Sequence, residues 1–244
     1  MPPFKKVPET DAIFANVKEV HQEAARSDST LRVSVDAKAT INLGPFSRGG
    51  YSRVGTRGAD HDFKPMGRLT PFGIFLPEHD DLSLYFTASK VTADFIVDTL
   101  TEWWQSVRAD FAHVDTLVVD LDNGPENNGT RSQFLQRLVD FSHQFGLTLR
   151  LTYYPPYHSK YNPIERCWGV LENYWRSELL DSVEAVLGYA AQMTYNGRHP
   201  RVCLRDRTYP IGVRLSKAER RRLEKQLQRT EALKKWAITI VPSV

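Results

Sequence analysis

The sequence predicts an α/β fold in which helices cover a mixed sheet, and three observations carry that prediction. Apolar and polar residues alternate at residues 31–35, as they do in a half-buried strand. Apolar residues recur at helical spacing across residues 96–107, which indicates an amphipathic helix. Segments of the two kinds then alternate along the chain, and strands separated by single helices are typical of sheets with parallel strands.

The predicted elements follow one another in a definite order. In sequence they are strands at residues 31–36, 40–43, 70–76 and 82–87, a helix at 93–107, a strand at 116–121, a helix at 130–145, a strand at 148–153 and a helix from Asn162. Apart from the short run at 40–43, this is three strands, helix, strand, helix, strand, helix. That is the order of a ribonuclease H-like domain, whose last two strands join the first through right-handed crossovers.

Local signals mark the ends of one of these helices. Thr130 and Gln133 have the spacing of a capping box, and Gly146 suits a helix end because glycine adopts the left-handed conformation at little cost. We therefore expect this helix to begin at Thr130 and to end before Gly146.

The 244 residues, 41% of them hydrophobic, are enough for one large domain or for a domain with an appendage. We expect a helical lead-in at residues 1–30, a ribonuclease H-like domain at 31–197 and a basic helical C-terminal extension at 198–244. The chain has no apolar run long enough to span a membrane, and its first residues lack the apolar core of a secretory signal. Two scattered cysteines exclude a disulfide framework, which favours a cytoplasmic protein.

A net charge of +3 is only mildly basic, so a nucleic-acid surface would have to come from local clusters. The first cluster comprises Arg48, Arg53, Arg57, Lys64 and Arg68. The second lies between Arg198 and Arg222, with nine Lys and Arg against two acidic residues. Such runs are more often solvated surfaces than binding sites, so they are weak indications on their own.

The stretch of residues 153–168 is the most informative, because a rigid aromatic and basic loop comes directly before a helix start. Its rings could stack on bases while His158 and Lys160 meet phosphates. A purely structural reading is also open. Asn162 is a good N-cap, Pro163 suits the first helical position and Glu165 stands where a capping-box carboxylate belongs.

The predicted fold brings Asp36, Asp122 and Glu165 to one region, because the first two follow strand ends and the third opens the last helix. Ligands gather beyond the carboxyl ends of strands in such sheets. Asp36 could simply cap a turn. The hairpin that Asp122-Asn123-Gly124 would favour is not followed by a strand. Asp120, on the same strand face, is a competitor of Asp122.

One further residue bears on this region. Gly169 lies one turn after Glu165 on the same helical edge, where it could leave room for an ion or substrate. The alternative is a close contact between helix and sheet.

Three motifs carry a resemblance to a known family. Arg-Val-Ser-Val-Asp-Ala-Lys at 32–38, Asp-Asn-Gly-Pro-Glu-Asn-Asn-Gly at 122–129 and Tyr-Tyr-Pro-Pro-Tyr-His-Ser-Lys-Tyr-Asn-Pro-Ile-Glu-Arg at 153–166 resemble those of ISAzo-type insertion-sequence transposases. That family is related to the mariner-like DDE recombinases, and the resemblance runs over nearly the whole chain. It implies a ribonuclease H-like catalytic domain whose triad is Asp36, Asp122 and Glu165, with Asp122 rather than Asp120 in the second position.

The resemblance implies a DNA transposase that cleaves DNA and transfers the cut strand. Asp36, Asp122 and Glu165 would hold two Mg²⁺ ions, or Mn²⁺, with Asp36 bridging them, because paired divalent ions suit in-line displacement at phosphorus. The expected partners are the element ends and target DNA, bound by a homodimer. No helix-turn-helix has room before Asp36, so we expect DNA binding of low sequence selectivity.

The remaining candidate residues would contact DNA. His158, Lys160 and Arg166 would position the backbone, and Tyr154 or Tyr157 could stack on a base. The chain's most one-sided basic segment contributes Arg220, Arg221 and Arg222 as the main phosphate contacts.

Three other functions fit the residues less completely. A metal-dependent nuclease would keep the site but lack strand transfer. A truncated or domesticated remnant would only bind DNA, although it would have no physical reason to retain three carboxylates. A glycosidase with paired carboxylates would act without metal and would leave the basic clusters without a role.

Overall fold

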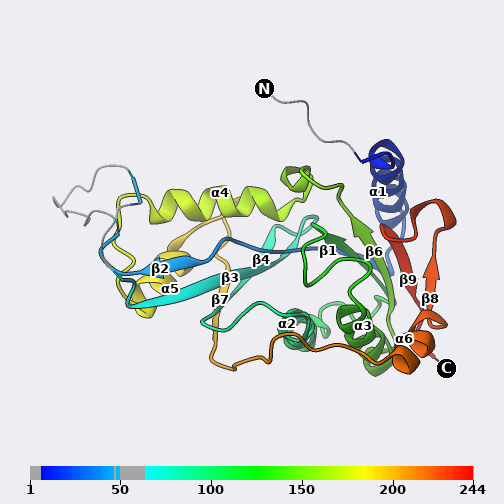
Figure 1. Cartoon of the computed structure of the whole chain (residues 1–244). Helices are drawn as coiled ribbons and strands as arrows, with labels where there is room; N and C mark the ends of the chain where they lie inside the picture. Colours follow the sequence, from blue (N-terminus) through cyan, green and yellow to red (C-terminus); the bar gives the residue numbers. More distant parts are fainter. Residues whose placement is uncertain (1–6, 47, 50–63, 244) are drawn as a thin grey trace.

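A central mixed sheet organises the molecule (Figure 1). The computed structural model describes residues 7–46, 48–49 and 64–243. Its strands are β1 (Thr30–Ala37), β2 (Ile41–Leu43), β3 (Gly67–Leu76), β4 (Asp81–Thr87), β5 (Thr116–Leu121), β6 (Thr148–Tyr153), β7 (Arg201–Arg205), β8 (Leu227–Arg229) and β9 (Ala237–Ile240). They lie in the order β7-β4-β3-β1-β5-β6-β9-β8, with β2 paired to β3.

The pairing directions explain which strand ends come together. β5 runs parallel to β1 and β6 runs parallel to β5, whereas β3 is antiparallel to both β1 and β4. The carboxyl ends of β1, β4, β5 and β6 therefore point to the same edge of the sheet. This edge carries the candidate site.

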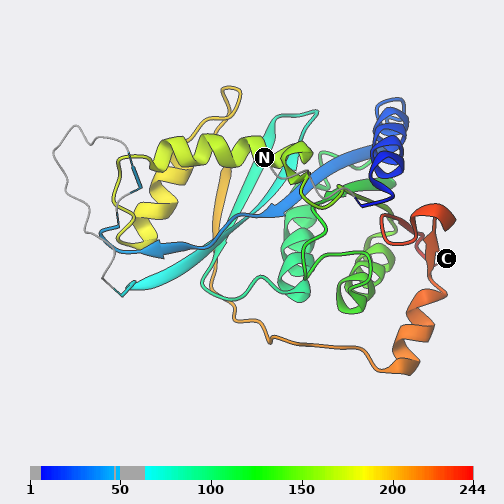
Figure 2. The same ribbon diagram turned by 45° about the horizontal axis from the view of Figure 1, so that its top comes forward.

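Helices cover both faces of the sheet (Figures 1 and 2). The helices are α1 (Thr10–Ala24), α2 (Ala93–Val107), α3 (Ser132–Phe145), α4 (Ile164–Trp175), α5 (Val183–Gln192) and α6 (Lys217–Glu224), with 3₁₀ turns η1 (Ser159–Tyr161) and η2 (Glu231–Leu233). The largest apolar core lies between the sheet and α2 and α3, and a second lies between the sheet and α4 and α5. A smaller cluster lies under α1.

Most of the predicted elements are confirmed, but the expectation of a helical C-terminal extension is wrong. β7 adds parallel to β4 at one edge, and β9 adds antiparallel to β6 near the other, so only α6 of this segment is an α-helix. These short strands pair with β4 and β6, so the backbone groups of those edges form hydrogen bonds. The basic residues of the segment do not indicate this pairing. The division of the chain at residues 30 and 197 stays a prediction.

The predicted capping box of α3 is also wrong. Its N-cap is Arg131, and the Thr130 hydroxyl donates to Asn128 Oδ1 at 2.7 Å. The Gln133 amide instead donates to Asp94 Oδ1 of α2 at 2.9 Å, so it joins two helices. The predicted end is confirmed, because Gly146 has φ of +67° in the left-handed region.

The helices of the described part of the chain are too short or too polar to cross a membrane.

Candidate active site

Asp36, Asp122 and Glu165 lie around one edge of the sheet. Asp36 is the penultimate residue of β1, and Asp122 directly follows β5, whose Asp120 is in register with Ser34. Glu165 is in the first turn of α4. Burial, followed by the negative charge of Asp122 and then of Glu165, raises the pKa of Asp36 to about 7. Asp36 is thus near enough to Asp122 and to Glu165 for both charges to act on it.

Asp36 is held from the α4 side by an indole. Trp168 Nε1 donates to Asp36 Oδ2 at 2.8 Å, and this hydrogen bond favours the ionised form of Asp36. Gly73 of β3, the antiparallel partner of Asp36, makes the contact possible. A Cβ at Gly73 would come within 2.5 Å of the Ile164 side chain and 2.7 Å of the Trp168 ring, so any side chain there would force these two side chains to move.

Asp122 begins a tight turn that leaves half of its carboxylate available. The Gly124 backbone N–H and the Asn127 side-chain amide both donate to Asp122 Oδ1, at 3.2 and 2.8 Å. Oδ2 accepts no hydrogen bond from the residues that the structure describes. Asn123 in this turn has φ of +63°, a conformation that asparagine tolerates better than most residues.

Glu165 is positioned by a link between α4 and β1. Ser34 Oγ donates to Asn162 Oδ1 at 2.5 Å and accepts from the Ile164 backbone N–H at 3.1 Å. Asn162 also donates to the Val35 carbonyl at 3.2 Å. The structural reading of Asn162 as an N-cap is therefore wrong, because its side chain binds the sheet and Pro163 is the N-cap residue. Glu165 forms no capping box, and its side-chain carboxylate accepts no hydrogen bond from the described residues.

The carboxylates border two hollows and are not gathered into a closed cluster. Asp36 and Asp122 line a pocket of about 230 Å³, and Glu165 borders one of about 290 Å³ with Lys160 and Arg166. Within the described ranges, no three His, Cys, Asp or Glu side chains are close enough together to hold a metal ion. Gly169 faces open space, so the alternative of a close contact between helix and sheet at this residue is excluded.

Asp120, the competitor of Asp122, is enclosed elsewhere on the same strand. It has no exposed surface, accepts from Thr152 Oγ1 at 2.6 Å and lies 2.8 Å from His21 Nε2 of α1. Arg32 Nε lies 4.0 Å from its other oxygen. Sequence reasoning missed His21, because nothing in the chain indicates which face of the sheet α1 covers.

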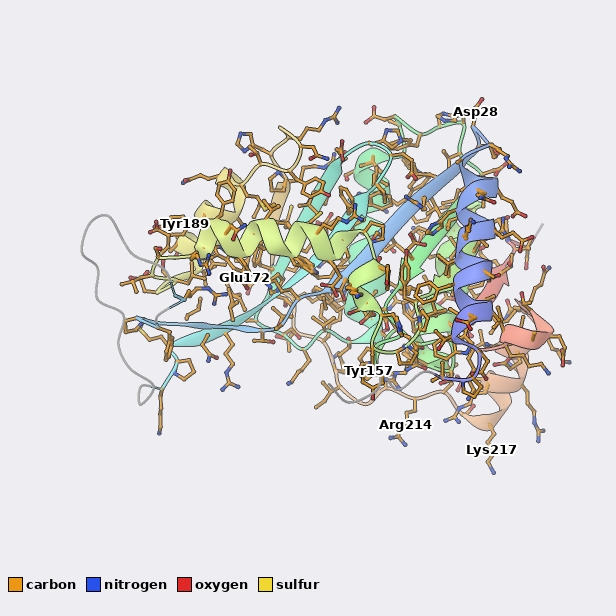
Figure 3. All side chains as sticks on the ribbon, turned by 90° about the horizontal axis from the view of Figure 1, so that it is seen from above. Asp28, Tyr157, Glu172, Tyr189, Arg214 and Lys217 are labelled. Atoms are coloured by element: carbon orange, nitrogen blue, oxygen red, sulfur yellow. The ribbon has the colours of Figure 1, made fainter. Side chains whose placement is uncertain are left out.

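The aromatic loop divides into a buried and an exposed part. Tyr154 is only 3% exposed and packs in the cluster under α1, so its predicted role in stacking on a base is wrong. Tyr157, labelled in Figure 3, is 69% exposed and has φ of +66°. His158 stacks on Tyr161 with ring centroids 6.1 Å apart, and both rings contact Phe14 of α1 edge-on. The loop thus exposes the Tyr157 ring, while the neighbouring His158 and Tyr161 rings pack against Phe14.

The basic residues differ in their surroundings. Arg201 and Arg207 form ion pairs of 2.7 Å with Asp81 and Asp98, and Arg205 pairs with Glu102, so these three fasten the C-terminal segment to the domain.

The other cations predicted to bind phosphate lie elsewhere. Arg220, Arg221 and Arg222 are exposed on α6, which lies beyond α3 on the opposite side of the sheet from α4 (Figures 1 and 2). The structure does not bring them to the carboxylates. Arg53 and Arg57 lie outside the described residues.

Comparisons with known proteins agree with this architecture. The family model of the Rhodopirellula transposase DDE domain matches residues 2–242. The Mos1 transposase paired-end complex with left transposon end has a TM-score of 0.50 and 14% identity, over 77% of this chain and 55% of that chain. The Mos1 mariner paired-end complex with Mn has a TM-score of 0.52 and 10% identity, over 78% of this chain and 55% of that chain.

These structural likenesses concern the fold, and they confirm the predicted ribonuclease H-like arrangement. The chain spans about half the length of the solved chains that it matches. No curated protein matches it.

Proposed function

Because the chain belongs to the family of transposase DDE domains, as its motifs predicted, we propose that it cleaves DNA and transfers the cut strand in a metal-dependent reaction. The catalytic residues in this proposal are Asp36, Asp122 and Glu165. The observation that carries it is the placement of Asp36, buried on β1 between two other carboxylates, with its pKa raised to about 7.

The residues at the site fit a divalent cation. Burial and two like charges destabilise ionised Asp36, and a cation would offset both. Asp122 keeps Oδ2 free of hydrogen bonds from the described residues, and Asn127 Oδ1 is buried without a partner among them. The structure does not gather the three carboxylates closely enough to hold one ion together. In the proposal, Asp36, Asp122 and Glu165 would draw together around Mg²⁺ or Mn²⁺, hard cations that prefer oxygen ligands and would offset the repulsion between the carboxylates. Bound ions would activate the attacking oxygen and stabilise the departing one.

The other site residues position the substrate and the carboxylates. Trp168 orients Asp36 through its indole N–H, and Asn127 with Gly124 orients Asp122. Lys160 and Arg166 border the same hollow as Glu165, where they would meet the phosphates of the reacting strand. The exposed Tyr157 would stack on a base beside the cut.

The proposed substrates are the two ends of an insertion sequence and a target DNA, brought together by a homodimer. The paired-end complexes of the Mos1 transposase support this arrangement by analogy of fold. Lys160, Arg166 and Tyr157 provide the phosphate and stacking contacts that such a complex would use near the carboxylates.

Plasmid cleavage tests the proposed activity. The unmodified chain should nick or linearise supercoiled DNA with Mg²⁺ or Mn²⁺ and should be inactive in EDTA. Asp36→Asn should abolish this, whereas Asp140→Asn, on the exposed face of α3, should not. A labelled target duplex added to the reaction should become joined to the cut ends. Cleavage without joining would indicate a nuclease, and activity that persists in EDTA would contradict the metal site.

A further inference from the structure

In the described part of the chain, the residues that line a hollow beside the candidate site are all neutral or basic. Its volume is about 370 Å³, and its polar side chains are Thr40, Asn42, Arg68, Thr70, Ser89 and Lys90. Among the residues that the structure describes, no carboxylate lines it, which excludes a metal site built from them. The same described residues include no aromatic side chain that could form a platform for stacked bases.

The two cations of this hollow are not engaged in holding the fold together. Arg68 and Lys90 are exposed, and neither has an ion pair with a carboxylate in the described residues. Two other cations near β1 and β2 differ, because Lys38 and Arg48 each lie 2.8 Å from Glu172 of α4, the residue labelled in Figure 3. An unpaired arginine and an unpaired lysine in one hollow leave two positive charges for a ligand.

Neutral hydrogen-bond donors complement these charges. Asn42 is opposite Arg68 in the β2–β3 register, and its exposed amide has no partner among the described residues. The Thr40 and Thr70 hydroxyls are 2.7 Å apart, so one hydrogen bond between them leaves the other proton free. Cations together with hydroxyl and amide donors are the groups that proteins direct at phosphate oxygens.

The hollow lies next to the carboxylate pocket. Ala37 and Phe72 are register partners that line the pocket of Asp36 and Asp122, and Thr70 is two residues before Phe72 on the same face of β3. On the other wall, Lys90 lines the hollow while the next residue, Val91, lines the pocket. A DNA strand leaving the carboxylates along β3 would enter the hollow directly.

We propose that this hollow binds the phosphodiester backbone of DNA adjacent to the reacting phosphate, on the α2 side of the carboxylates. This inference rests on the proposed function and adds to it a second substrate contact. The strand is then held on both sides of the reaction, by the loop with Tyr157 and Lys160 before α4 and by Arg68 and Lys90 beyond β1.

Salt-dependent binding tests the proposal independently of cleavage. The affinity of the full chain for a fluorescent DNA duplex is measured in EDTA at several salt concentrations. Each phosphate contact adds about 0.9 to the slope of log affinity against log salt, so Arg68→Gln with Lys90→Gln should lower it by about 1.8. Arg68→Lys with Lys90→Arg should retain the slope because both charges remain.

Two arginines at the opposite edge of the sheet provide a matched control. Arg26 and Arg108 are exposed, and replacing both with Gln removes the same charge. The proposal is overturned if the Arg68 and Lys90 pair leaves the slope unchanged, or if the control lowers it equally. The binding assay contains no metal, so it tests the proposed contact even if the chain is inactive in plasmid cleavage. If the chain cleaves plasmid DNA but the Arg68 and Lys90 substitutions leave the slope unaltered, the proposed activity stands and the proposed contact at the hollow is wrong.

Discussion

Asp120 and Asp122 are separated by one residue, yet the molecule accommodates their charges in opposite ways. Asp120 is fully buried: Thr152 and His21 both bind its Oδ1, and Arg32 Nε lies 4.0 Å from Oδ2, which has no hydrogen-bond partner among the described residues. Asp122 lies at the rim of a pocket, and one of its oxygens has no donor in the described part of the chain. Its neighbour across the sheet edge, Asp36, is buried beside like charges.

The difference separates a carboxylate that stabilises the fold from carboxylates that weaken it. A buried carboxylate is tolerated where protein groups offset part of the loss of water, as Thr152, His21 and Arg32 do around Asp120. At the rim the protein brings like charges together without enough positive partners, an arrangement that is common where a cation or substrate completes the site. We therefore expect mutations at the two places to affect different measurable properties.

The largest expected effect is the loss of activity in Asp122→Asn. An amide keeps the shape and can still accept from Gly124 and Asn127, but it is a poor ligand for Mg²⁺. Plasmid cleavage should fall to background, while the free energy of unfolding at pH 7 should not fall and should rise slightly, because a like charge near Asp36 is removed. If Asp120→Asn abolishes cleavage and Asp122→Asn does not, the second catalytic carboxylate is Asp120.

The next largest effect concerns the pH dependence of stability. Folded Asp36 keeps its proton up to pH about 7, whereas the ordinary value is 3.8. The folded state therefore binds more protons between these pH values, and the free energy of unfolding falls as pH rises through this window. The fall amounts to about 4 kcal/mol, at about 1.4 kcal/mol for each pH unit.

Urea unfolding without metal between pH 4 and pH 8 measures this dependence. Asp36→Asn should remove most of it, because the amide does not titrate, and should be the more stable protein at pH 7. Equal pH dependence in both proteins would show that Asp36 is not destabilised by its surroundings.

Asp120→Asn should have a smaller effect, of the opposite kind. The change replaces the carboxylate oxygen that faces Arg32 with an amide N–H, so that two donors meet in a buried place, and it should lower the free energy of unfolding by about 2–3 kcal/mol. Cleavage by the folded fraction should be largely retained. Unfolding and cleavage assays at one temperature separate the two outcomes, and unchanged stability would contradict the role assigned to the buried cluster.

Trp168→Phe should have the smallest effect. The phenyl ring still packs on Gly73, but the hydrogen bond that favours ionised Asp36 is lost, so the pKa of Asp36 rises further. For a rise of about one unit, the ionised fraction of Asp36 at pH 7, and with it cleavage, should fall about fivefold and recover as the pH is raised. A uniform loss at every pH would indicate that Trp168 only fills space.

Much of the fold and of the proposed triad could be predicted, because both depend on local patterns. Alternation located β1 and β5, helical spacing located α2, and the Asp-Asn-Gly and Asn-Pro-Ile-Glu motifs located two carboxylates. The connections over long distances could not be predicted. Asn162 suits a helix cap, and only the packed structure shows that it binds Ser34 and Val35.

Composition also concealed contacts. The charges of the segment from Arg198 mask the short strand β7, whereas β9 is an apolar run of only four residues, too short for a clear alternation. One residue of β3 does indicate a contact between distant elements. Gly73 interrupts a strand of large apolar residues, which indicates a close approach of another element, and that element is Trp168 on α4.

The link between Ser34 and Asn162 also determines when the site can exist during protein synthesis. These residues are 128 positions apart, and contacts between distant parts of a chain form slowly. A nascent chain that ends in β6 already contains Asp36 and Asp122, but it lacks the helix that delivers Glu165. β9, which flanks β6, is made later still. We therefore expect the unfinished chain to be inert toward nearby DNA, because the last carboxylate arrives only when the fold is almost complete.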